Sequence, residues 1–172
     1  MILTGNEIIR QVQLGNITIS PFSASQVNPN SYNYRLGEYC TEVHPQTSLG
    51  RGVPCEQLVE IPKTGLRLEP GRVYLSHTLE TIGSRKFVPS LIGRSSVGRM
   101  GLFLQLAADL GNLGAAHRWT LELTCVQPII VYPTMIIGQV SFWVPVGDIV
   151  EYTGQYTDFS LPKNSVYNSR MG

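Results

Sequence analysis

The feature that most constrains the fold is how closely glycine and proline follow one another after residue 15. The chain has 172 residues, of which 17 are Gly and 11 are Pro. Both residue types interrupt helices and end strands, so the intervening segments have room for short strands and little helix. NITISPF at 16–22 alternates as a strand does, and YNYRLG at 32–37 is extended. Seven further segments read as strands: 58–61, 72–79, 86–92, 102–106, 119–127, 129–132 and 136–144. Many short strands separated by turns predict an all-β barrel or sandwich.

The N-terminal segment has a different character. Thr4 followed by Glu7 fits a capping box, and Ile8 and Val12 lie on one helical face, which predicts a short helix ending near Gly15. The length fits one domain, residues 1–172. Residues 146–172 are polar and irregular, and we interpret them as a C-terminal arm that packs on a neighbouring subunit or as a flexible tail.

Composition excludes several classes of protein. A formal charge of +1 gives no general field for attracting nucleic acid, so any anion site must be local. The three cysteines are widely spaced and lack a C-x-x-C pair, which argues against a disulfide framework or a zinc cluster. No apolar signal segment is visible, and the apolar run 129–140 is interrupted by Pro133 and Gly138 and is too short to span a bilayer. We therefore expect a cytoplasmic protein that binds neither nucleic acid nor membranes.

One nine-residue segment, GRSSVGRMG at 93–101, combines two arginines, two serines and three glycines. Glycines let backbone amides approach an anion, hydroxyls donate hydrogen bonds, and the guanidinium fork suits phosphate oxygens. The segment is either an anion cradle or a glycine-rich turn on a basic surface.

Glu122 stands alone in the apolar run WTLELTCV. It is either an outward-facing strand residue or a carboxylate that exchanges protons with a substrate. With the cradle nearby, it would suit proton-shuttle chemistry on a phosphorylated small molecule. The P-C-x-x-C signature of zinc deaminases is absent, because position 58, three residues after Cys55, is leucine and not cysteine. We interpret His77 as structural.

At this point the sequence resembles a known family. The segments PFSASQVNPNSYNYRLG, LRLEPGRVYLSHTLETI, VPSLIGRSSVGRMGLF, WTLELTCVQPI and IIGQVSFW occur in the order of the dCTP deaminase branch of the trimeric dUTPase superfamily. The resemblance implies a mainly β fold, a distorted dUTPase-like barrel with a short N-terminal helix. It also implies a homotrimer with active sites between subunits, Mg²⁺ carried by the nucleotide phosphates, and no zinc.

The resemblance also assigns roles. Glu122 matches the general base that takes a proton from water and passes it to N3 and the departing ammonia. Ser95, Arg99 and the Ala108 backbone match groups that hold the water. The remaining matches are substrate-binding positions: Arg94, Ser96 and Gln139 on the phosphates, Gln105, Leu106, Ala107, Asn112 and Ala115 around the nucleoside, and Gln155 and Tyr156 in the arm.

Several of these positions depart from the family pattern. Residues 105–108 read Q-L-A-A where the family reads H-V-T-A, and Asn112 replaces an aspartate that serves the attacking water in dUTPases. Ala115 replaces an aromatic that excludes a 2′-hydroxyl, and Gln155 replaces a phosphate-binding lysine. His117 replaces a glycine, and it either enters the pocket or is an ordinary residue at a strand end.

The sequence thus predicts deamination of a cytosine nucleotide, by default dCTP to dUTP and ammonia. Three alternatives stay open: a variant substrate such as CTP, CMP or a modified pyrimidine nucleotide, a dUTPase-like pyrophosphatase, which Asn112 disfavours, and a nucleotide-binding paralogue without turnover.

Overall fold

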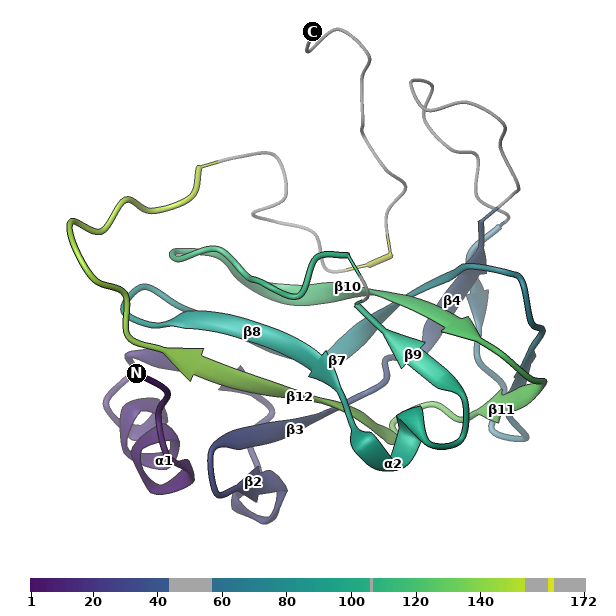
Figure 1. Cartoon of the computed structure of the whole chain (residues 1–172), viewed down its shortest axis with the longest axis horizontal. Coiled ribbons are helices and arrows are strands. Elements are labelled where there is room, and N and C mark those ends of the chain that lie inside the picture. Colours follow the sequence, from purple (N-terminus) through teal and green to yellow (C-terminus); the bar gives the residue numbers. More distant parts are fainter. Residues whose placement is uncertain (44–56, 106, 154–160, 163–172) are drawn as a thin grey trace, which may run out of the picture.

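The computed structural model describes residues 1–43, 57–105, 107–153 and 161–162, and its strands form three sheets (Figure 1). A six-stranded sheet contains β1 (Ile17–Ser20), β4 (Tyr39–Glu42), β5 (Val59–Glu60), β7 (Tyr74–Ser84), β9 (Leu102–Leu104) and β10 (Ala116–Cys125), in the order β5-β4-β7-β10-β9 with β1 on β7. A four-stranded sheet has the order β2 (Val27–Asn28), β3 (Ser31–Arg35), β12 (Ile136–Trp143), β8 (Val88–Gly93). β6 (Leu66–Leu68) pairs with β11 (Ile129–Val131). The helices are α1 (Gly5–Gln13), a 3-10 turn (Ala24–Gln26) and α2 (Ser95–Gly98).

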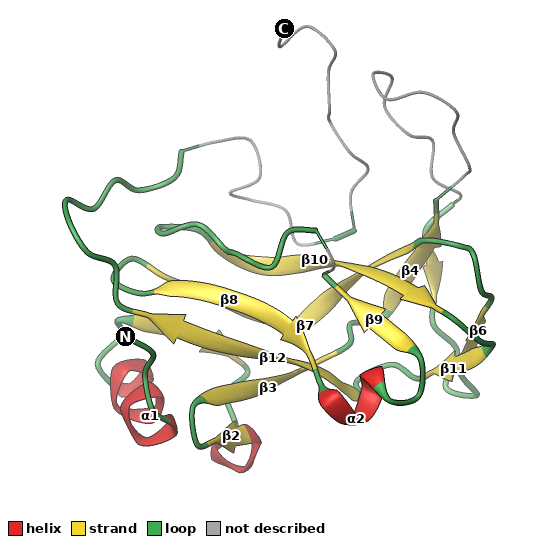
Figure 2. Cartoon of the chain, viewed as in Figure 1, coloured by secondary structure: helices red, strands yellow, loops and turns green. Residues whose placement is uncertain are grey.

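The mainly β prediction is confirmed, since strands make up most of the regular structure (Figure 2). All seven of the further expected strands are present with shifted ends. The expected strand 72–79 continues as β7 to Ser84, because the carboxylate of Glu80 is neutralised inside the sheet. It accepts hydrogen bonds from Arg35 Nε at 2.7 Å and from the Arg35 backbone N–H at 2.9 Å. Three strands that the sequence did not indicate, β2, β4 and β6, are short and obtain their stability from pairing with β3, β7 and β11 respectively.

The N-terminal helix is confirmed, although the capping box is not formed. Thr4 occupies the N-cap position but its side chain makes no capping hydrogen bond. Glu7 instead accepts from Gln11 Nε2 at 2.5 Å, one turn further along. The helix ends before Gly15, which has a φ of 73°, a conformation that glycine adopts without strain.

One hydrophobic core spans the two larger sheets, with Tyr32, Phe142 and Leu121 among its fully buried side chains. β10 alternates at its C-terminal end: Leu121 and Leu123 are buried, whereas Glu122 is only partly buried and faces away from them. The core therefore fixes β10 and leaves the Glu122 carboxylate outside it. None of the helices in the described residues is long and apolar enough to cross a membrane.

Candidate functional site

Glu122 lines a pocket of about 230 Å³ at the β9–β10 connection. Five of the residues predicted for the site meet here: Gln105, Ala108, Asn112, Ala115 and Glu122. Glu122 is the one carboxylate among the described residues that line this pocket, which is also bordered by Leu110, His117, Trp119, Thr120 and Tyr152. The volume lies below the ~300 Å³ at which pockets for drug-sized ligands begin, so the pocket suits a nucleoside-sized group.

Gln105 fastens the loop after β9 to the strand that carries Glu122. Its Oε1 accepts from the Glu122 backbone N–H at 3.0 Å, and its Nε2 donates to the Ala108 carbonyl at 3.1 Å. The Gln105 backbone N–H donates to the Glu122 carbonyl at 3.3 Å. Both polar atoms of the Gln105 side-chain amide, which was predicted to contact substrate, therefore hydrogen-bond to the protein backbone.

An irregularity in β10 lets residues of both faces line the same pocket. Arg118 of β10 pairs with Thr81 of β7, and Thr120 of β10 pairs with His77 of β7. A step of two residues along β10 therefore corresponds to a step of four residues along β7, which shifts the register of the pairing. Trp119 lies at this break, where its backbone N–H donates to Thr78 Oγ1 at 2.9 Å. Without the break, Trp119 and Thr120 would point to opposite faces of the sheet.

His117 and Trp119 form an aromatic wall of the pocket that the sequence analysis did not assign. Their ring centroids lie 4.3 Å apart, and the indole N–H donates to the Ile82 carbonyl at 2.8 Å. His117 Nδ1 lies 2.9 Å from the Arg118 carbonyl, which can only accept, so Nδ1 is the donor of this hydrogen bond. Of the two interpretations of His117, the structure supports the one in which it enters the pocket. The signal that could have found this wall was its pattern, two aromatic rings two residues apart beside Ala115.

The segment after β12 supplies another wall. Tyr152 lines the pocket, and its backbone N–H donates to the Leu113 carbonyl at 2.9 Å. Gly114, with a φ of 90°, allows this close approach, since a Cβ there would lie 3.0 Å from the Glu151 Cβ. Most of the proposed arm, 146–172, lies outside the described residues, as do the predicted site residues Leu106, Gln155 and Tyr156.

The predicted cradle forms a second cluster at the end of β8. α2 follows the tip of that strand (Figure 1), with Ser95, Ser96 and Arg99 exposed and Val97 buried as its anchor. Within the described part of the chain, neither Arg94 nor Arg99 forms an ion pair with a carboxylate, so their guanidinium groups can accept an anion as partner.

Gln139 lies beside this second cluster. Gly138 pairs with Gly93, the residue immediately before Arg94, and Gln139 pairs with Ile92. Gln139 Nε2 donates to Asn33 Oδ1 at 3.2 Å. Asn33, which the sequence analysis did not single out, thereby orients the predicted phosphate-binding glutamine.

The two clusters are separate within one chain. The loop that borders the Glu122 pocket docks on the first half of β8, where Leu91 N–H donates to the Asp109 carbonyl and Gly111 N–H to the Pro89 carbonyl, each at 2.7 Å. No residue of 94–99, nor Gln139, is among the described residues that line the pocket. A single chain thus presents the carboxylate pocket and the predicted anion cradle as two separate clusters.

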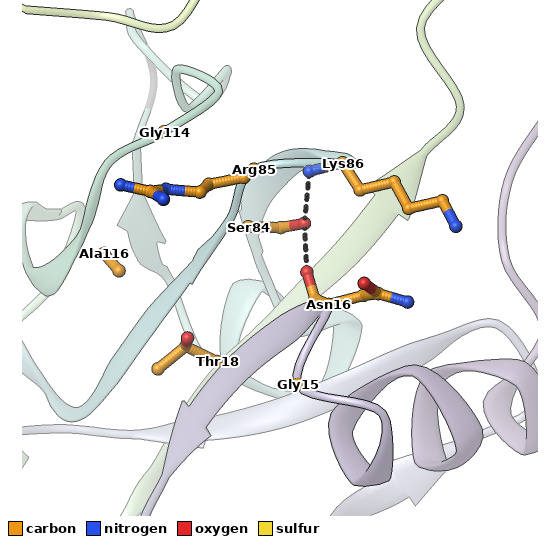
Figure 3. A pocket seen from close by; sticks show the side chains of 8 residues that line it. All are labelled: Gly15, Asn16, Thr18, Ser84, Arg85, Lys86, Gly114 and Ala116. Atoms are coloured by element: carbon orange, nitrogen blue, oxygen red, sulfur yellow. Dashed lines mark hydrogen bonds between the residues drawn. The ribbon is translucent and has the colours of Figure 1, made fainter.

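A larger hollow of about 510 Å³ lies elsewhere, between β1, the β7–β8 turn and residues Gly114 and Ala116. Figure 3 shows that the charged ends of Arg85 and Lys86 diverge in it. The Ser84 hydroxyl donates there to the Asn16 carbonyl at 2.6 Å and accepts from the Lys86 N–H at 3.0 Å. Because no reactive groups converge, we place the chemistry in the smaller pocket.

Neither a cluster of metal-binding side chains nor a reactive thiol is found among the described residues of the pocket or of the predicted cradle. The described residues contain no group of three or more His, Cys, Asp or Glu side chains that could hold a metal ion. Cys40 and Cys125 are free and buried, and burial raises the pKa of the Cys40 thiol to about 12. Cys55 lies outside the described residues.

Fold and site together define a small β-protein with a nucleoside-sized pocket beside one carboxylate, and with the arginine–serine segment 93–99 in a separate place. The chain belongs to the dCTP deaminase-like family, whose model matches residues 2–144. The resemblance noted in the sequence is confirmed.

Named relatives agree with this family. A protein of Hathewaya histolytica called "dCTP deaminase, dUMP-forming" is 43% identical over 157 residues, covering 91% of each chain. A protein of Clostridium beijerinckii with the same name is 44% identical over 143 residues, covering 83% of this chain and 82% of its own length. A Rhodopirellula baltica "dCTP deaminase" is 42% identical over 153 residues, covering 88% of this chain and 76% of its own.

A solved structure shows the same fold. The 2'-deoxycytidine 5'-triphosphate deaminase from Agrobacterium tumefaciens superposes with a TM-score of 0.68 at 22% sequence identity. The match covers 84% of this chain, and this chain spans about half of that one, 48%.

Proposed function

We propose that the protein deaminates dCTP by hydrolysis at C4 of cytosine, with Glu122 as the general base. Glu122 removes a proton from water, and the resulting hydroxide adds to C4. Glu122 delivers this proton to N3, where it stays in the product, and then takes the proton of the new C4 hydroxyl and passes it to the amino group. The C4–N bond breaks, ammonia leaves, and C4 becomes a carbonyl. The observation that carries this proposal is the pocket itself, in which a partly buried carboxylate is the one described acid beside a nucleoside-sized space.

The other pocket residues would hold the reactants. Asn112 can hydrogen-bond a sugar hydroxyl, and the Ala108 carbonyl can accept a hydrogen bond from the attacking water. His117, Trp119 and Tyr152 provide ring surfaces for packing on the planar base or the sugar.

The phosphates would bind to the cradle of a neighbouring subunit in a homotrimer. Arg94, Ser96 and Gln139 supply donors for phosphate oxygens, whereas Ser95 and Arg99 would reach the reaction centre of the adjacent copy. The separation of the two clusters in one chain supports this arrangement, since a single copy lacks part of the predicted set.

Mg²⁺ would enter as the counterion of the nucleotide triphosphate. The cradle offers guanidinium, hydroxyl and amide donors, which suit phosphate oxygens and not a bare cation. The ion would neutralise charge on the phosphates while Glu122 acts on the base.

The direct test is ammonia release from dCTP, with the nucleotide product identified by chromatography. We expect ammonia and a uracil nucleotide in equal amounts. If dCTP binds but yields no ammonia, the protein is a nucleotide-binding paralogue without turnover, and the proposed reaction is wrong.

The phosphate content of the product separates two versions of the activity. Asn112 cannot act as a base, which favours dUTP as the product and disfavours pyrophosphatase action. The names of the relatives, dUMP-forming, favour release of pyrophosphate as well. Pyrophosphate formed in step with ammonia would show that another group replaces the missing aspartate.

Ribonucleotides are a second candidate substrate class, because Ala115 is too small to exclude a 2′-hydroxyl. Turnover of CTP within about tenfold of dCTP, a difference of ~1.4 kcal/mol, would support relaxed sugar selection. A strong preference for dCTP would instead show that His117, Trp119 or Tyr152 restores the wall that Ala115 lacks.

A further inference from the structure

Gln105 interrupts a regular strand pairing at the point where Glu122 sits. The last pair of the β9–β10 ladder is Leu104 with Leu123, so Gln105 and Glu122 would form the next pair. One of the two backbone hydrogen bonds of that pair is present, since the Gln105 N–H donates to the Glu122 carbonyl. In a regular antiparallel pair, the Glu122 N–H would donate back to the Gln105 backbone carbonyl.

The side chain takes over this second bond. Gln105 has a φ of 51°, an uncommon conformation for a residue with a Cβ, and it turns the chain out of β9. Gln105 Oε1 now accepts the Glu122 N–H at 3.0 Å in place of the backbone carbonyl. The other end of the same amide donates to the Ala108 carbonyl at 3.1 Å.

One planar group therefore spans the two sides of the pocket. The amide joins the backbone of Glu122, from the strand, to the backbone of Ala108, from the loop. Donation to the Ala108 oxygen also leaves one lone pair of that carbonyl directed elsewhere, available to a further donor.

We propose that Gln105 is a positioning residue that fixes the distance between the Glu122 carboxylate and the Ala108 carbonyl, and that it does not itself contact the nucleotide. Its consequence for catalysis rests on the proposed deaminase function. We call the two hydrogen bonds of the Gln105 amide, to the Glu122 N–H and to the Ala108 carbonyl, the clamp. The existence of the clamp does not depend on the proposed function.

Two substitutions separate the halves of the clamp. In Gln105→Glu the side chain keeps an acceptor for the Glu122 N–H but has no donor for the Ala108 carbonyl. In Gln105→Leu, which has a similar size, both bonds are lost. Gln57→Leu is the matched control, because Gln57 is exposed and lies outside the pocket.

The first measurement is amide hydrogen exchange of Glu122 by NMR, which requires no activity. We expect faster exchange at Glu122 in Gln105→Leu, near-native exchange in Gln105→Glu, and no change in Gln57→Leu. Native exchange at Glu122 in a folded Gln105→Leu protein would overturn the proposal whatever the enzyme's activity. If the Gln105→Leu protein does not fold, the kcat and KM of Gln105→Glu test the proposal instead.

The second measurement is the split between kcat and KM. Misplacement of reacting groups by about 1 Å costs on the order of 100-fold in rate, so kcat should fall by up to that factor in both Gln105 variants while KM stays near its native value. A raised KM with native kcat would show that Gln105 binds substrate, contrary to the proposal. Absence of ammonia release from the wild-type protein would count against the proposed function and leave the exchange result to judge the clamp.

Discussion

Glu122 combines two properties that rarely coincide on a strand. Its neighbours Leu121 and Leu123 are fully buried, which holds the backbone in place, while its own side chain faces a pocket. A rigid backbone and an accessible carboxylate are the requirements for a general base, because proton transfer depends on fixed short distances.

Replacing Glu122 with glutamine tests this role directly. Glutamine keeps the shape but cannot accept a proton, so we expect ammonia release from dCTP to fall by ~10²–10⁴-fold with nucleotide binding retained. The assay is ammonia release together with calorimetric binding of dCTP. Glu60→Gln, on the exposed strand β5, is the control and should behave as wild type; an active Glu122→Gln protein would rule out Glu122 as the base.

His77 is a buried histidine with a different role. Its ring stacks on Tyr39 at 6.2 Å, Nδ1 contacts the Thr78 carbonyl at 2.9 Å, and Nε2 is buried with no hydrogen-bond partner in the described structure. Burial lowers the pKa of His77 below its ordinary value of 6.5. The prediction that His77 is structural agrees with this setting.

The lowered pKa of His77 predicts an acid-sensitive fold. Below about pH 6.5 the unfolded chain binds a proton at this histidine that the folded chain resists, so the free energy of unfolding should decrease as pH falls. The slope for one such group is at most ~1.4 kcal/mol per pH unit. Urea unfolding from pH 7.5 to 5.5 should show a shallower decrease in His77→Phe than in the wild type, and equal slopes would show that His77 does not control the effect.

Helices and strands could be predicted from the sequence where the structure of a segment depends mainly on its own residues. Helix α1, strand β1 with its buried and exposed alternation, and the strands around Glu122 all follow from local pattern. The break in β10 could not be predicted, because it depends on Thr78 of another strand accepting a hydrogen bond at Trp119. The aromatic wall of His117 and Trp119 does not need the break, because residues two apart on a strand lie on one face. What could not be predicted is that Thr120 and Glu122 line the same pocket as these rings.

The candidate site shows the same division. Glu122, Asn112 and Ala115 were predicted from motifs and do line one pocket. Tyr152 was missed as a pocket residue because its position depends on a backbone hydrogen bond to Leu113, 39 residues earlier in the chain. Gln105 was predicted to contact substrate from the resemblance alone. No sequence pattern reveals that its amide hydrogen-bonds to the backbone on both sides, and those bonds are the basis of the positioning role that we propose for it.

Strand β12 offers a test of packing beside the cradle. A Cβ at Gly138 would collide with the Tyr34 ring, which is fully buried and whose hydroxyl donates to the Ile92 carbonyl at 3.1 Å. We therefore expect Gly138→Ala to lower the free energy of unfolding by ~1–3 kcal/mol, as overpacking does in other cores. Gly98→Ala is the control, because a Cβ there meets nothing within 4 Å; equal stability of the two variants, measured by urea unfolding, would contradict the collision.

At the scale of the whole molecule, the carboxylate pocket and the cradle lie on different parts of one chain. The pocket lies between the β9–β10 loop and β10, and the cradle follows the end of β8. In a cyclic trimer each copy can present its pocket to one neighbour and its cradle to the other. Every complete site would then need two chains.

Mixing two inactive variants tests this assembly. Glu122→Gln damages the pocket and Arg99→Ala damages the cradle, so each alone should release little ammonia. If subunits combine at random after co-expression, about one quarter of the sites in a 1:1 mixture receive a native pocket from one chain and a native cradle from the next. Ammonia release should therefore recover to about that fraction of the wild-type rate. A mixture of Glu122→Gln with Asn112→Ala, both in the pocket, should not recover, because every pocket then carries one defect. No recovery in either mixture, with mixed trimers verified by mass spectrometry, would show that each site is built within one chain and that the separation of the two clusters closes by movement of the chain itself.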